Sequence, residues 1–133
     1  MIALDTNVLV RLLLHDDPRQ AKAAERVFIN ARRDQTPLWL SDIVLCELVW
    51  VLTRRAGLAR AEIARAVDQL LRTELIVVND PRAVDRALTA YRDGRGDFAD
   101  YLIREQAVAA GATGVVTFDR VLKGESGFQL LGS

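Results

Sequence analysis

Residues 1–7 read Met-Ile-Ala-Leu-Asp-Thr-Asn, and this stretch decides the expected fold. Four apolar residues are followed at once by three polar ones, and then by an apolar segment at residues 8–14. A short apolar run in front of a helical pattern predicts a buried strand that leads into a helix. In open parallel α/β sheets, ligands bind outside the carboxyl ends of the strands, which is where Asp5 would lie. An ordinary helix cap is the alternative for Asp5, because Asp, Thr and Asn are all favoured at that position.

Strand-like and helix-like segments alternate along the whole chain. Further strands are expected at 38–40, 74–78, 114–117 and 128–131, and helices at 8–14, 19–33, 43–56, 60–73, 81–92 and 97–111. This order predicts parallel βαβ units and therefore an α/β fold. We expect a three-layer α/β/α sandwich with a central, mostly parallel five-stranded sheet. Because no repeat, low-complexity segment or linker interrupts the pattern, we expect one domain over residues 1–133.

Composition narrows the class of protein. A formal net charge of zero and a pI of 6.6 do not by themselves indicate a nucleic-acid binder. All but two of the 18 basic residues are Arg, which suits bidentate phosphate contacts, although a GC-rich coding sequence gives the same enrichment. We expect no signal peptide and no membrane span, since no apolar run approaches ~20 residues. The lone Cys46 excludes an internal disulfide and favours a cytoplasmic protein in which it is a small buried apolar residue.

Glu47 is the one charged residue in the apolar run Ile-Val-Leu-Cys-Glu-Leu-Val-Trp-Val-Leu at 43–52. Ionised carboxylates are rarely buried without a partner, because removing the charge from water is costly. We therefore expect Glu47 to meet a cation, a metal ion or a water-filled pocket. A buried salt bridge to an Arg is the alternative.

Three further aspartates lie at expected element ends. Asp97 and Asp100 open a helix and share one face of it; Asp97 is a plausible cap, whereas Asp100 lies about one turn further in. Asp119 comes just after the apolar strand at 114–117. If these acids share one sheet edge with Asp5 and Glu47, their mutual repulsion requires a cation. Oxygen ligands of this kind suit Mg²⁺ or Mn²⁺, which serve phosphoryl transfer.

Together these motifs resemble the PIN-domain ribonucleases, and among them the VapC-type toxins of prokaryotic toxin–antitoxin pairs. The matching segments are Leu-Asp-Thr-Asn at 4–7, Glu47 in its apolar helix, Asp-Phe-Ala-Asp followed by Tyr-Leu-Ile at 97–103, and Thr-Phe-Asp at 117–119. No one motif is specific, but their order and spacing cover essentially the whole chain. The resemblance implies a Mg²⁺- or Mn²⁺-dependent endoribonuclease, the toxin of a type II toxin–antitoxin system, that hydrolyses RNA phosphodiesters.

The resemblance also assigns roles to residues. Asp5 and Asp100 match the principal metal ligands, and Glu47 and Asp119 match the acids that complete the metal site. Asp97 is an additional catalytic aspartate, and either Asp97 or Asp100 can be the one that faces the metal. The small polar residues that would orient these acids or their waters are Thr6, Asn7, Ser41 and Thr117. The chain departs from the family at Tyr101, where a small residue is more common.

The family resemblance further implies a homodimer and a small antitoxin protein that lays a helix in an apolar groove. The apolar helices at 8–14 and 43–56, with Trp39 and Trp50, offer surface for such contacts, and core packing is the alternative for these residues. Two other functions stay open: a catalytically silent PIN-like dimer that binds RNA or a partner, and a small Mg²⁺-dependent phosphatase. Asn7 disfavours the phosphatase, because such enzymes usually carry a second Asp two residues after the first.

Overall fold

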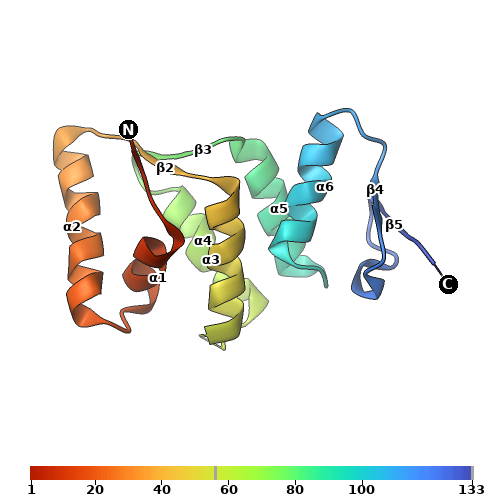
Figure 1. The fold of residues 1–133 in the computed structure, drawn as a ribbon, viewed down its shortest axis with the longest axis horizontal. Coiled ribbons are helices and arrows are strands. Elements are labelled where there is room, and N and C mark those ends of the chain that lie inside the picture. The colour runs from red at the N-terminus through yellow and green to blue at the C-terminus, as the bar shows by residue number, and fades with distance from the viewer. Residues whose placement is uncertain (56, 133) are drawn as a thin grey trace. The chain divides into compact units, whose positions relative to one another are not determined.

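The computed structural model describes residues 1–55 and 57–132, which divide into two compact units, Met1–Asn79 and Asp80–Ser133. The first unit contains β1 (Ile2–Ala3), α1 (Thr6–Leu14), α2 (Pro18–Asp34), β2 (Leu38–Leu40), α3 (Asp42–Arg55), α4 (Arg60–Leu71) and β3 (Ile76–Val78). The second unit contains α5 (Pro81–Asp93), α6 (Phe98–Ala109), β4 (Val115–Thr117), the 3-10 turn η1 (Arg120–Leu122) and β5 (Phe128–Leu130) (Figure 1).

The sheet of the first unit is parallel, with β2 between β1 and β3. Leu38 of β2 lies opposite Ile2 on one side and Ile76 on the other. Leu38 and Leu40 are fully buried, as expected for the middle strand of a parallel sheet covered by helices. Because parallel strands end at one edge, the segments that follow β1, β2 and β3 lie along the same edge of this sheet.

The helices of the first unit begin and end within about two residues of their predicted bounds. The Asp17 carboxylate caps α2 by accepting a hydrogen bond from the Gln20 amide at 3.1 Å, and Pro18 occupies the first turn. α1 packs against α2 and α3, and α3 packs against α4. Gly57 has the positive φ of +59° that favours glycine after a helix. The predicted end of that helix at Ala56 lies outside the described residues.

The second unit is built on two helices and a strand pair. α5 packs along α6, and β4 pairs with β5 in parallel, with Val115 opposite Phe128. Its core includes the aromatic side chains of Tyr91, Phe98 and Tyr101, each no more than 2% exposed. This unit therefore holds the start of α6 and the carboxyl end of β4, where three of the predicted acids lie.

The α/β class and the parallel strands are confirmed, but the prediction of one five-stranded sheet is not. The strands of the described residues form a three-stranded sheet and a two-stranded sheet. The physical reason is that an apolar run identifies a strand without identifying its neighbour, and strands of two or three residues offer few ladder hydrogen bonds. No helix within residues 1–55 or 57–132 combines the length and apolarity needed to cross a bilayer.

Candidate active site

Asp5 follows β1 after Leu4 and is the N-cap of α1. Its backbone is extended, and its Oδ1 accepts a hydrogen bond from the Thr6 amide at 2.8 Å. The capping alternative is therefore observed. It does not remove Asp5 from the candidate site, since an ionised carboxylate has a second oxygen and several lone pairs, and the side chain is exposed.

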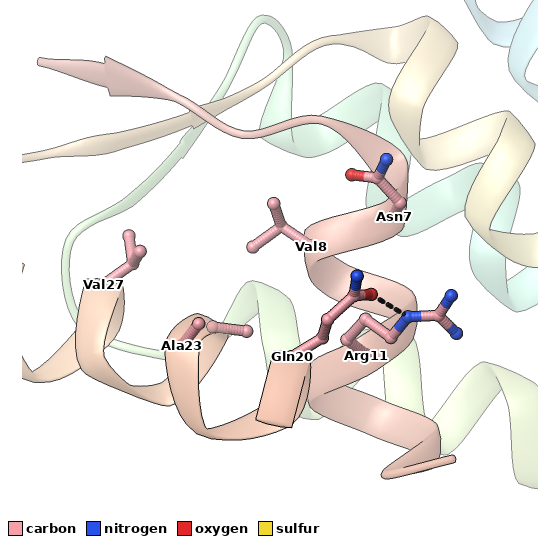
Figure 2. Close-up of a pocket in the computed structure, with 7 residues that line it drawn as sticks. Asn7, Val8, Arg11, Gln20, Ala23 and Val27 are labelled. Atoms are coloured by element: carbon pink, nitrogen blue, oxygen red, sulfur yellow. Dashed lines mark hydrogen bonds between the residues drawn. The ribbon is translucent and has the colours of Figure 1, made fainter. Parts of the chain in front are cut away.

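Thr6 and Asn7, two of the predicted supporting residues, have different surroundings. Thr6 is 7% exposed, and its Oγ1 is buried with no hydrogen-bond partner among the described residues. Asn7 is exposed and lines a pocket of about 260 Å³ between α1 and α2. In Figure 2, Arg11 lines the same pocket, and its Nε donates a hydrogen bond to Gln20 Oε1. The Thr6 hydroxyl therefore lies beside Asp5 without a partner in the described part of the chain, but its burial keeps it from contact with solvent or substrate, and its expected role in orienting an acid or a water stays a prediction.

Ser41 follows β2 and caps α3. Its Oγ accepts a hydrogen bond from the Val44 amide at 3.1 Å, and its carbonyl oxygen accepts one from the Leu45 amide. The predicted supporting residue thus fixes the start of the helix that carries Glu47.

Glu47 is exposed, so the burial that its apolar neighbours suggested is not observed, and the expectation that it meets a cation, a metal ion or a water-filled pocket stays a prediction. The buried face of α3 consists of Leu45, Leu48, Val49 and Leu52. Glu47 lies on the opposite face, together with Ile43 at 70% and Trp50 at 56% exposed. These exposed apolar neighbours made the helix appear buried all round in the sequence. Among the described residues no ion pair forms with Glu47 either, so its assignment depends on the family pattern alone.

Asp97 and Asp100 open α6. Asp97 is the exposed N-cap, and its backbone amide donates a hydrogen bond to Asp100 Oδ2 at 2.9 Å. Asp100 is half-buried. Burial raises the pKa of Asp100, the Asp97 amide opposes this shift, and the negative charges of Asp97 and Asp119 add to it. A nearby cation would therefore favour the ionised form of Asp100.

Asp119 lies just past β4, as predicted, and caps η1. Its Oδ1 accepts a hydrogen bond from the Val121 amide at 3.0 Å, while its own amide donates to Thr117 Oγ1 at 3.0 Å. Thr117 thus orients the backbone of Asp119. The second unit places the charges of Asp97 and Asp119 where both act on Asp100.

The donor chemistry of the predicted acids fits a hard divalent cation. All five are carboxylates, which Mg²⁺ and Mn²⁺ prefer, and a cation would neutralise the charges that raise the pKa of Asp100. Asp5 and Glu47 belong to the first unit, and Asp97, Asp100 and Asp119 belong to the second. Across the described residues, no group of three or more His, Cys, Asp or Glu side chains is arranged to hold a metal ion.

Sequence reasoning overlooked two polar residues at the carboxyl edge of the first sheet. Asp42 follows β2 and Asn79 follows β3, and Asn79 Nδ2 donates to Asp42 Oδ2 at 3.4 Å. Trp39 Nε1 donates to Asn79 Oδ1 at 3.2 Å. The strand-end rule that singled out Asp5 applies equally to these two residues and would have found them.

The matches to known proteins cover the stretch of the chain that contains these motifs. A model of the PIN domain matches residues 2–124, a span that contains all five acids. The chain is also 28% identical, over 123 residues, to a VapC ribonuclease of Aquifex aeolicus (strain VF5); the match covers 92% of this chain and 90% of that protein. On the extent of the domain match, the chain belongs to the PIN-domain family.

Proposed function

We propose that this protein is a divalent-metal-dependent endoribonuclease and the toxin of a type II toxin–antitoxin system. The observation that carries the proposal is the PIN-domain match over residues 2–124, which spans both units and all five predicted acids. Similarity to a VapC ribonuclease over most of both chains supports RNA as the substrate. In this proposal residues 1–133 work as one nuclease domain, and its predicted acids serve the cleavage of an RNA phosphodiester.

Asp5 and Asp100 would bind the cation directly, and Glu47 and Asp119 would complete the site, with Mg²⁺ or Mn²⁺ as the expected ions. The bound cation would supply a more acidic water and neutralise charge on the phosphate. Backbone hydrogen bonds hold the two proposed direct ligands. The Thr6 amide fixes Asp5 Oδ1, and the Asp97 amide fixes Asp100 Oδ2. Each acid therefore keeps one oxygen on the backbone and offers the other for binding.

The proposed partners are a small antitoxin and a second copy of the chain. A groove of about 480 Å³ in the first unit is lined by residues of α1, α2 and α4, among them Leu12, Phe28, Ile29 and Leu70. A mostly apolar groove of this kind suits an amphipathic helix. The exposed Ile43 and Trp50 on α3 offer a further apolar surface.

Cys46 is a free thiol, in keeping with a reducing cytoplasm.

Cleavage of RNA by the purified protein tests the proposal. We expect cleavage with Mg²⁺ or Mn²⁺, none in excess EDTA, and loss of cleavage in Asp5→Asn and Asp100→Asn without loss of folding. Asp85→Asn is the matched control, because Asp85 is an exposed acid on α5 outside the candidate site. Robust cleavage in EDTA would contradict the proposal. RNA binding without turnover under every ion condition would instead support a non-catalytic binding module.

A further inference from the structure

The segment that leads into α6 is bound to side chains through each of three successive amides. The amides of residues 95, 96 and 97 donate in turn to Glu125 Oε1 at 3.0 Å, to the Tyr101 hydroxyl at 3.0 Å and to Asp100 Oδ2 at 2.9 Å. Residues 93–96 read Asp-Gly-Arg-Gly, a composition typical of a turn. In the structure this turn is held by partners from α6 and from the segment before β5.

Tyr101 links two of these partners. Its hydroxyl accepts from the Gly96 amide and donates to Glu125 Oε1 at 2.8 Å. The side chain is 1% exposed, and its ring meets Phe128 edge-on, with 6.2 Å between ring centroids. The Arg104 guanidinium stacks 5.0 Å from the Tyr101 ring centroid. The ring is thus fixed by packing while its hydroxyl joins the turn to Glu125.

The two glycines of the turn leave the space that Tyr101 occupies. A Cβ atom on Gly96 would lie 2.5 Å from Leu122 Cδ2 and 3.3 Å from the Tyr101 hydroxyl oxygen. A Cβ atom on Gly94 would overlap that hydroxyl and would lie 2.8 Å from the Ala90 carbonyl oxygen. Residues 94–96 are therefore shaped around the tyrosine that departs from the family pattern.

We infer that Tyr101 and Glu125 form a tether that positions Asp97 and Asp100 for binding the cation. Tyr101 directly follows Asp100, and its hydroxyl reaches back to the amide just before Asp97, so the tether encloses both acids. Glu125 lies between η1 and β5. Its hydrogen bonds therefore connect the segment with Asp97 and Asp100 to the strand pair that carries Asp119. Tyr101 is thus a positioning residue. This role rests on the proposed function, but the tether itself can be measured without it.

Hydrogen exchange of the backbone amides, measured by NMR, tests the tether. Tyr101→Phe removes the hydroxyl and keeps the ring, so we expect the Gly96 amide to exchange roughly fivefold faster, the effect of losing one ordinary hydrogen bond. Tyr91→Phe is the matched control, because Tyr91 is a buried tyrosine of the same unit that lies on α5. An unchanged Gly96 exchange rate in Tyr101→Phe would overturn the tether.

Calorimetric titration with Mn²⁺ tests the positioning role. We expect Tyr101→Phe and Glu125→Ala to weaken Mn²⁺ binding about tenfold, as loss of an outer-shell partner typically does, and to lower kcat more than they change KM. Glu125→Gln keeps an oxygen that accepts from the Arg95 amide and from Tyr101, so it should recover most of the affinity lost in Glu125→Ala. Tyr91→Phe should bind Mn²⁺ like the wild type.

The possible results distinguish a failure of the tether from a failure of the proposed enzymatic function. Faster Gly96 exchange with wild-type Mn²⁺ affinity in Tyr101→Phe would overturn the positioning role, and a wild type that binds no Mn²⁺ would overturn it as well. A wild type that binds Mn²⁺ but cleaves no RNA contradicts the proposed function, while the exchange and titration results still decide the tether. If Tyr101→Phe does not fold, the comparison of Glu125→Ala with Glu125→Gln decides it.

Discussion

Thr6→Val should make the protein more stable and less active. The Thr6 side chain is buried next to Asp5, and its Oγ1 has no hydrogen-bond partner among the described residues. A buried polar group without a partner costs about 1–3 kcal/mol of stability. Valine has nearly the shape of threonine and a similar helix propensity, so the methyl group removes this cost without a new clash.

We expect the free energy of unfolding to rise by about 1 kcal/mol, the low end of that range. Urea denaturation would show this as an increase of about 0.5 M in the midpoint, for a slope near 2 kcal/mol/M. We also propose that the Thr6 hydroxyl helps to orient Asp5, so RNA cleavage should fall in the same variant. Thr53→Val is the control, since the Thr53 hydroxyl already donates to the Val49 carbonyl oxygen at 2.8 Å.

Two results would refute this reasoning. A loss of about 1 kcal/mol or more in Thr6→Val would mean that the hydroxyl has a stabilising partner in the folded protein. A gain in stability with full cleavage activity would remove Thr6 from the site and leave its hydroxyl as a simple packing defect.

Three further predictions concern other side chains. Glu47→Gln should change the free energy of unfolding by no more than about 0.5 kcal/mol, since Glu47 is exposed. It should nevertheless reduce RNA cleavage more than tenfold, because Glu47 is proposed to complete the metal site. Unfolding of this variant would contradict the exposure of Glu47. Burial, and then the Asp42 charge, raise the pKa of the Cys46 thiol to about 11. Iodoacetamide at pH 8 should therefore alkylate Cys46 far more slowly than free cysteine. Labelling at the rate of free cysteine would contradict this raised pKa. The hydrogen bond from Arg11 holds the pKa of Asp16 below 3.8, so Asp16 stabilises the fold above that pH and loses this effect as the pH falls further. The difference in urea midpoint between wild type and Asp16→Asn should therefore shrink in acid. A difference that stays constant with pH would contradict this prediction.

Local elements were predictable because their signals are local. Asp17-Pro18 and Asp80-Pro81 each place a capping side chain before a first-turn proline, and both helices begin there. The apolar run at 38–40 is the buried strand β2, as expected. In each case the deciding contacts lie within a few residues along the chain, so the sequence alone contains them.

Properties that depend on distant residues were harder to predict. Nothing in the sequence around Glu47 distinguishes a helix buried all round from one whose Ile43 and Trp50 face solvent. The pairing of strands likewise depends on partners far along the chain, which an apolar run does not specify. Tyr101 was noticed only as a departure from the family, because its role depends on Glu125, which lies 24 residues away.

Titration of Mn²⁺ into the wild type, Asp5→Asn and Asp100→Asn tests the central proposal most directly, since these two acids are the proposed direct ligands. The proposal is that Asp5 and Asp100 each bind a divalent cation. It predicts that Mn²⁺ binds the wild type and binds each of the two variants at least tenfold more weakly, because each variant loses a ligand. Asp85→Asn should keep the wild-type affinity, because it changes a remote surface residue. Unchanged affinity in either Asp5→Asn or Asp100→Asn would contradict it.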